Sequence, residues 1–112
     1  MQKNQIVRLA HQQEITWHDI LQQLKRDLNL SGIDTDFFDQ IASFEQLIDD
    51  LVVFVEQLLQ YHPELFSNLI YRIDISENQI QKIENENLQT TFAELIIKRL
   101  IQKVYFRKKY SG

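Results

Sequence analysis

Residues 37–61 read FFDQIASFEQLIDDLVVFVEQLLQY, and this stretch decides the fold. Placed on a helical wheel, its phenylalanine, leucine, isoleucine and valine side chains gather in one broad arc. The opposite arc carries amides and acids, among them Glu45, Asp49 and Glu56. A surface helix typically buries a stripe of roughly 100°, and this arc is wider. We therefore predict a long central helix over about 37–61 that is covered by more than one neighbour.

A capping signature begins the helix that precedes this stretch. Thr16 places a hydroxyl at the N-cap position and Asp19 places a carboxylate three residues later, which is the pattern of a capping box. Apolar residues then recur at helical spacing, so we predict a helix over 17–29. For the central helix, Asp36 with Asp39 is the predicted N-cap pair, since acids in a first turn favour the positive end of the helix dipole.

His62 and Pro63 are predicted to end the central helix, because the residue before a proline avoids the α region. Proline also suits the first turn of a new helix, which should extend to about Asp74. Residues 71–75 alternate like a strand, but the chain offers no second strong strand to pair with them. We predict a helix here, with the strand as the alternative.

The last third of the chain predicts two further helices. Ser76 followed by Gln79 opens a short polar one, and the polar residues 85–87 are predicted to end it. The final helix is predicted to begin within 88–92 and to fray after Arg107. Its apolar residues recur at helical spacing and form one buried stripe.

A chain of 112 residues has the usual length of a single domain. It should bury roughly 65% of the surface that its unfolded chain exposes, enough for a core without disulfides or metals. Two glycines and one proline are too few for the hairpins of an all-β fold. We predict an all-α fold, a small single-domain bundle of four to five helices over 1–112. Within it, residues 1–15 form either a short helix or a loose arm.

Composition excludes several kinds of chemistry. The chain contains no cysteine, which excludes disulfides, thiolate metal sites and a cysteine nucleophile. Its beginning lacks the apolar run of a signal peptide, and no apolar stretch approaches the ~18 residues of a membrane span, so we expect a cytoplasmic protein. Phosphate-binding loops need more glycine than Gly32 and Gly112 provide, and no serine lies in a nucleophile elbow. The motifs therefore indicate no cofactor.

Histidine and carboxylate spacings give little support for a metal site. His11 and His18 flank Glu14 at helical spacings, but an N-cap at Thr16 breaks any helix that would join them. The acids of the central helix lie on its polar arc, and no Glu-x-x-His motif accompanies them. We therefore expect solvated histidines and a solvated acidic face, which would pair with the basic final helix.

Charge is distributed unevenly along the chain. Residues 1–91 carry six basic and fifteen acidic side chains, whereas residues 92–112 carry six basic side chains and one acid. One interpretation is internal compensation, in which the basic final helix lies beside acidic helices. The other is a contact surface for an anion or a protein partner. The candidate surface consists of Lys98, Arg99, Lys103, Arg107, Lys108 and Lys109, interleaved with Tyr105, Phe106 and Tyr110.

The leading hypothesis is a non-enzymatic protein that binds a protein partner or a second copy of itself through helix faces. Phe38, Val53, Tyr61 and Leu95 lie off the predicted apolar stripes. Helical proteins with spare apolar surface often form two-fold dimers, so the sequence leaves a homodimer and a monomer equally open. The alternative is binding of nucleic acid or an anionic surface through residues 98–109, although the pI of about 5.3 argues against it. A second alternative is an enzyme whose histidines and carboxylates meet only in space.

Overall fold

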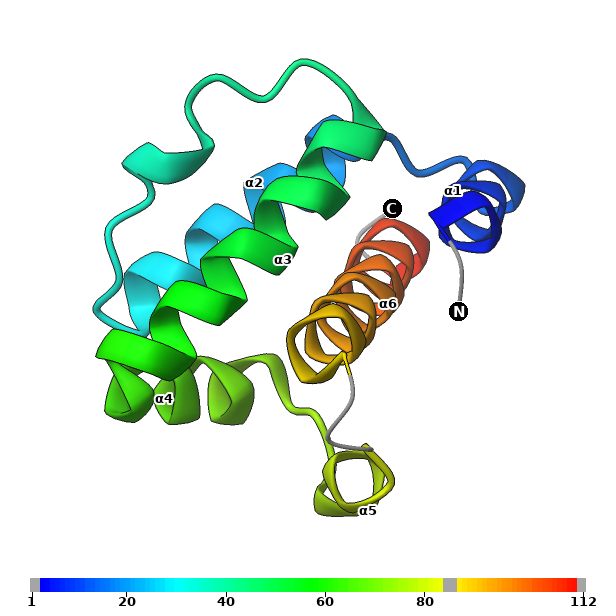
Figure 1. The fold of residues 1–112 in the computed structure, drawn as a ribbon. Coiled ribbons are helices and arrows are strands. Elements are labelled where there is room, and N and C mark those ends of the chain that lie inside the picture. The colour runs from blue at the N-terminus through cyan, green and yellow to red at the C-terminus, as the bar shows by residue number, and fades with distance from the viewer. Residues whose placement is uncertain (1–2, 84–86, 111–112) are drawn as a thin grey trace.

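The computed structural model describes residues 3–83 and 87–110, and every regular element in them is helical (Figure 1). The elements are α1 (Lys3–Gln12), α2 (Trp17–Leu30), the 3₁₀ turn η1 (Asp36–Phe38), α3 (Phe44–Tyr61), α4 (Pro63–Ile73), α5 (Glu77–Gln81) and α6 (Leu88–Tyr110). The predicted all-α class is confirmed, with six α-helices in the described residues rather than four to five. The segment for which the sequence left a loose arm open forms α1.

Helix α6 lies in the middle of the fold and packs against α1, α2, α3 and α4 (Figure 1). Its buried side chains include the whole predicted stripe, and Phe92, which was predicted to lie beside that stripe, is buried as well. The stripe consists of Ala93, Ile96, Ile97, Leu100, Ile101 and Val104. The sequence assigned the centre to a single helix, whereas α3 and α6 share it. Although α6 has 23 residues, neither it nor any other helix in the described residues is apolar enough over a sufficient length to cross a membrane.

Helix α3 is the predicted central helix, but it begins at Phe44, seven residues later than expected. Ser43 is its N-cap, and the Ser43 hydroxyl accepts a hydrogen bond from the Gln46 backbone N–H at 3.1 Å. The Gln46 side chain in turn accepts from the Ala42 N–H at 2.9 Å. The predicted cap at Asp36 is therefore wrong, because Ser43 and Gln46 accept the hydrogen bonds of the free backbone N–H groups at the start of α3.

The apolar residues just before α3 pack on it from outside the helix. Phe38 is fully buried, and its ring centroid lies 4.9 Å from that of Phe54. The ring of Phe37 lies 5.2 Å from Phe54 but remains partly exposed. These two residues therefore belong to a segment that covers α3 from outside the helix, and the expectation that Phe38 is spare surface is wrong.

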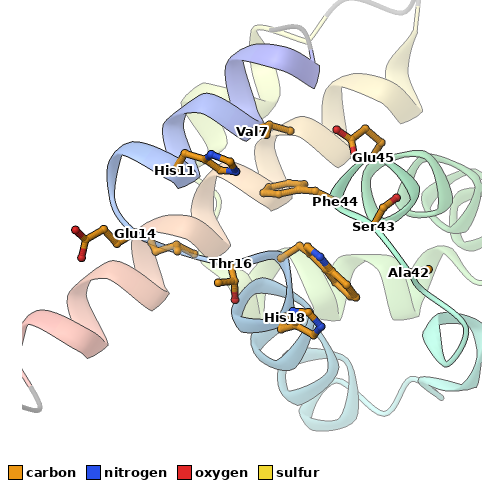
Figure 2. A pocket seen from close by; sticks show the side chains of 11 residues that line it. Val7, His11, Glu14, Thr16, His18, Ala42, Ser43, Phe44 and Glu45 are labelled. Atoms are coloured by element: carbon orange, nitrogen blue, oxygen red, sulfur yellow. The ribbon is translucent and has the colours of Figure 1, made fainter.

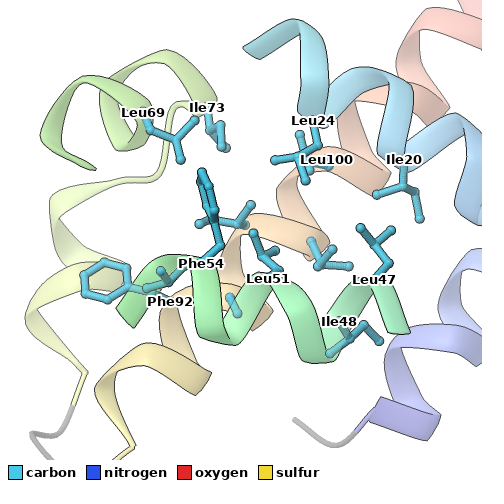
Figure 3. Close-up of a cluster of buried hydrophobic side chains, with 14 of the residues drawn as sticks. Ile20, Leu24, Leu47, Ile48, Leu51, Phe54, Leu69, Ile73, Phe92 and Leu100 are labelled. Carbon is cyan, nitrogen blue, oxygen red and sulfur yellow. The ribbon is translucent and has the colours of Figure 1, made fainter. Parts of the chain in front are cut away.

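The hydrophobic core lies between α3 and the helices that pack on it. Figure 3 shows α3 side chains pointing toward side chains from α2, α4 and α6. Those that meet there include Leu24, Leu47, Leu51, Leu69 and Leu100, all of which are fully buried. The prediction that several neighbours cover the apolar arc is therefore confirmed for the helical part, Phe44–Tyr61.

Two predicted capping boxes are confirmed. The Thr16 N–H donates to Asp19 Oδ2 at 3.1 Å, and Thr16 Oγ1 accepts from the Asp19 N–H at 3.2 Å. Ser76 and Gln79 make the same reciprocal arrangement at the start of α5. The predicted stop at 85–87 lies largely outside the described residues.

The helix ends after α3 follow proline and local backbone geometry. Pro63 is the first residue of α4, as predicted. Helix α4 continues to Ile73, so the strand alternative for 71–75 is wrong. Helix α6 continues to Tyr110, beyond the predicted fraying at Arg107.

Glu14 occupies the turn between α1 and α2 with φ of 57°, in the left-handed region that favours glycine. We expect Glu14→Gly to raise the free energy of unfolding by up to about 1 kcal/mol, because glycine has no Cβ to strain this backbone. Urea unfolding followed by circular dichroism measures the change. The control is Gln22→Gly on the exposed side of α2, which should destabilise by roughly 0.5–1 kcal/mol. A loss of stability from Glu14→Gly would contradict the prediction.

Candidate functional site

The basic side of α6 faces acids on α2. Lys103 Nζ lies 3.1 Å from Asp27 Oδ2, and Lys108 Nζ lies 2.8 Å from Asp19 Oδ2. Both acids belong to α2, near its two ends. These pairs are the internal compensation of charge that one interpretation of the sequence predicted.

Two arginines of the candidate surface also bind within the chain. Arg99 Nη2 lies 3.5 Å from Asp74 Oδ2, and Arg99 Nε donates to the Ile73 carbonyl at 3.2 Å. Arg107 Nη1 donates to Gln23 Oε1 at 2.6 Å. Most of the cations of the candidate surface therefore join helices to one another, while a binding role for the set stays a prediction.

The acidic face of α3 does not pair with α6 as the sequence suggested. Its Asp49 forms an ion pair with Lys3 of α1 instead. Glu45 and Glu56 are exposed on the same helix. Helix α6 packs on the apolar side of α3, so the acids on the opposite side of α3 lie out of its reach.

Asp27 is the most deeply buried carboxylate in the described part of the chain, with only 2% of its surface exposed. Besides the ion pair with Lys103, its Oδ1 accepts a hydrogen bond from Gln23 Nε2 at 3.3 Å. Lys103 Nζ also donates to the Arg72 carbonyl at 3.2 Å. One ammonium group thus ties α6 to α2 and α4. The sequence holds a signal for this cluster, since Asp27 falls within the apolar stripe of its helix.

Asp19 is partly buried, and burial alone would raise the pKa of its carboxyl group. Hydrogen bonds from Lys108 and Thr16, together with the positive charge of Lys108, outweigh this effect. They hold the pKa below its ordinary value of 3.8. The fold therefore stabilises the ionised form.

This lowered pKa predicts how stability depends on pH. Ionised Asp19 contributes stability above about pH 3.8, the ordinary value, and the contribution is lost as pH falls through the lower pKa of the folded protein. We expect Asp19→Asn to be less stable than the wild type at neutral pH, by a margin that shrinks below pH 3.8. Urea midpoints of the two proteins across the acid range measure this margin. When Lys108 is already replaced by Gln, the additional change Asp19→Asn should cost less stability than it does in the wild type. A margin that stays constant into acid would contradict the prediction.

The last turn of α6 presents aromatic rings and a cation to solvent. Phe106 is 48% exposed and Tyr110 is 73% exposed, and their rings stack with centroids 6.1 Å apart. Lys109 Nζ lies 5.5 Å from the centroid of the Tyr110 ring and 5.8 Å from that of Tyr105. We call Phe106, Lys109 and Tyr110 the aromatic–basic end of α6.

A hollow of about 700 Å³ lies where α1, α2 and the start of α3 meet (Figure 2). Trp17 and His18 stack on one another there, with ring centroids 3.7 Å apart. His11 points toward Phe44 across the hollow in Figure 2. The hollow therefore brings together two of the three histidines that the sequence separated.

The enzyme alternative requires a histidine paired with a carboxylate in such a hollow. Glu45 lines it with His11 and His18. Within residues 3–83 and 87–110, however, the histidine that lies near a carboxylate is His62, which does not line this hollow. Its Nδ1 lies 3.9 Å from Glu64 Oε1 at the exposed junction of α3 and α4. The same residues contain no group of three potential ligands that could hold a metal ion. The hollow offers stacking surfaces rather than a positioned acid–base pair.

A groove of about 440 Å³ lies at the opposite end of α2, between the turn after that helix, the end of α3 and the start of α4. Its apolar lining includes Ile33, Phe54 and Leu58. Tyr61 also lines the groove and is 66% exposed. We call it the α3–α4 groove. The sequence placed Tyr61 outside the apolar stripe of the central helix but did not predict the groove, because one wall of the groove comes from an irregular loop.

The α3–α4 groove has an acidic rim. Asp34 lines it, and the charges of Asp34 and Asp39 raise the pKa of nearby Asp36 above its ordinary value. Lys25 forms an ion pair with Asp39 at 3.1 Å, and Asp34 and Asp36 are further exposed acids of the same loop. Glu64, at the start of α4, lies 3.9 Å from His62, which lines the groove. The groove thus combines apolar walls with negative charge.

Comparison with protein-family models, with curated proteins and with solved structures finds no match for this chain. The fold and the surface together define its class. It is an all-α globule in which a basic helix is held by acids of its neighbours, and in which apolar side chains remain exposed around an acidic groove.

Proposed function

We propose that this protein is a non-enzymatic helical interaction module that binds another protein chain. The observation that carries the proposal is a set of large apolar side chains exposed at one end of the molecule: Leu30, Phe37, Tyr61 and Tyr71. We call this set the apolar end. Exposed apolar surface that is contiguous and rimmed by polar groups is typical of binding surfaces, and aromatic residues are enriched at protein interfaces.

Three of the four side chains of the apolar end line two hollows that meet at consecutive residues, Ser31 and Gly32. Leu30 and Tyr71 line one shallow depression together with Ser31. Gly32, the next residue, lines the α3–α4 groove beside Tyr61. Phe37 joins the same surface through its ring contact with Phe54 of the groove. A partner covering this end would therefore meet one surface rather than scattered side chains.

The charges support a protein partner over nucleic acid or an anionic surface. An anion-binding surface needs cations that are free to neutralise phosphates, but Arg99, Lys103 and Lys108 already face carboxylates of the same chain. A cytoplasmic location is part of the proposal, and a chain that contains no cysteine is compatible with a reducing compartment.

The test compares the wild type with Tyr61→Ser in affinity capture and in light scattering after size exclusion. We expect the wild type to form a complex with a protein chain, its own or another, and Tyr61→Ser to weaken it. The matched control is Gln60→Ser, an exposed neighbour on α3 that does not line the groove. A monomer without any partner contradicts the proposal. So does a complex with nucleic acid that dissociates at about 0.5 M salt, where the Debye length is only about 4 Å.

A further inference from the structure

We propose that the α3–α4 groove binds the aromatic–basic end of α6 from a second copy of this chain, so that copies associate head to tail. The inference rests on the proposed function and names the partner for its binding surface. Apolar fit and charge support it independently, and the distance between the two surfaces requires that the contact join two copies.

The apolar fit comes from two rings on one helix face. Phe106 and Tyr110 are four residues apart, so they project from the same side of α6, and their rings are nearly parallel, with an interplanar angle of 13°. Both are more exposed than is usual for such large apolar side chains. The groove offers Phe54 and Leu58 as its apolar lining. Aromatic anchors that fill such a groove are the contacts that dominate binding energy at interfaces.

Charge favours the same pairing. The groove is lined by Asp34, and the exposed Asp36 belongs to the same loop, while the end of α6 carries Lys109 beside the exposed ring of Tyr110. The mutual repulsion of the aspartates, visible in the raised pKa of Asp36, would be relieved by a cation from the partner. A two-fold contact of groove against groove would instead place these acids against identical acids, which is unfavourable.

The two surfaces lie too far apart to meet within one copy. Lys108 pairs with Asp19 in the first turn of α2, whereas the groove begins at Gly32, just beyond the last turn of that helix. Helix α2 has 14 residues, which corresponds to roughly 20 Å at about 1.5 Å per residue. The contact must therefore join different copies, and a contact between unlike surfaces extends into a chain unless the geometry closes a ring.

The experiment measures mass against concentration by light scattering and sedimentation. We expect the wild type to grow beyond a dimer as concentration rises. Tyr61→Ser, which alters the groove, and the double variant Phe106→Ser/Tyr110→Ser, which alters the helix end, should each weaken association roughly tenfold or more, as for aromatic anchors. The matched control is Val53→Ser, an exposed apolar residue of α3 that does not line the groove. It should associate like the wild type, and thermal melts confirm that each variant is folded.

Mixing the two kinds of variant gives the decisive result. Tyr61→Ser keeps an intact helix end and Phe106→Ser/Tyr110→Ser keeps an intact groove, so the mixture should form a one-to-one dimer that does not grow. A different outcome would overturn the inference: Tyr61→Ser abolishes a dimer, Phe106→Ser/Tyr110→Ser does not, and mixing the two variants restores nothing. That outcome would indicate groove-to-groove pairing instead. A wild-type monomer at every concentration would also overturn it. The proposed function would survive that outcome if capture still found a different protein chain that Tyr61→Ser loses.

Discussion

Leu51→Ala should lower the free energy of unfolding by about 2–5 kcal/mol. Leu51 lies midway along α3, is fully buried, and points toward the other core helices in Figure 3. The substitution removes buried apolar surface and leaves a cavity that rigid neighbouring helices only partly fill. Urea unfolding of wild type and variant, followed by circular dichroism, measures the loss as a shift in midpoint at unchanged slope.

The matched control lies on the other side of the same helix. Gln57 is exposed, so Gln57→Ala should change the free energy of unfolding by less than about 0.5 kcal/mol. Gln46 is not an equivalent control, although it shares the polar arc, because its side chain holds the Ala42 N–H at the start of α3. Gln46→Ala should therefore cost about 0.5–2 kcal/mol, as the loss of a cap does. If Gln57→Ala were as damaging as Leu51→Ala, the assignment of buried and exposed faces would be wrong.

The sequence predicts the helices best where a local signal marks their ends. Thr16 and Ser76 begin helices by capping boxes that form as expected, and Pro63 begins α4. Such signals act over three or four residues, so they do not depend on how the rest of the chain packs.

The start of α3 shows where the prediction fails. Apolar residues before Ser43 repeat at helical spacing, and this periodicity extended the predicted helix back to residue 37. Ser43 and Gln46 carry the correct signal, a serine followed three residues later by glutamine. Before Ser43 the periodicity also misassigns the buried ring, because Phe37 fits the helical spacing and is 39% exposed, whereas Phe38 lies off that spacing and is fully buried. Phe38 is buried because its segment packs on α3 from outside the helix.

The candidate surfaces could be predicted only in part. The rings at the end of α6 and the exposed Tyr61 are visible in the sequence, because each breaks a local pattern. The α3–α4 groove is not, since its walls come from a loop, α3 and α4, and only packing brings them together. The sequence predicted that the cations of α6 pair with acids of other helices, but it did not predict which acids. Charge totals show that compensation is available, while helix positions decide that α2 and Asp74 supply it.

Asp27→Ala should lower the free energy of unfolding by about 3–5 kcal/mol, because it removes one partner of a buried ion pair and leaves the other charge uncompensated. The Asp27 side chain is 3% exposed and that of Lys103 is 22% exposed. The Lys103 ammonium group also donates a hydrogen bond to the Arg72 carbonyl, and this bond opposes movement of the ammonium group into solvent. The loss includes the hydrogen bond from Gln23. Urea unfolding at neutral pH measures it.

Two comparisons separate the charge effect from simple loss of packing. Asp39→Ala removes the ion pair between Asp39 and Lys25, which has the same length as the pair between Asp27 and Lys103 but joins two more exposed side chains. This substitution should lower the free energy of unfolding by only about 0–1 kcal/mol. The double variant Asp27→Leu/Lys103→Met removes both charges and fills the space with apolar groups. It should recover most of the stability that Asp27→Ala loses, since replacing a buried pair by apolar residues of similar size is often neutral. If Asp27→Ala cost no more than Asp39→Ala, or if the double variant were the least stable of the three, the buried charge would not be what holds α6 against α2.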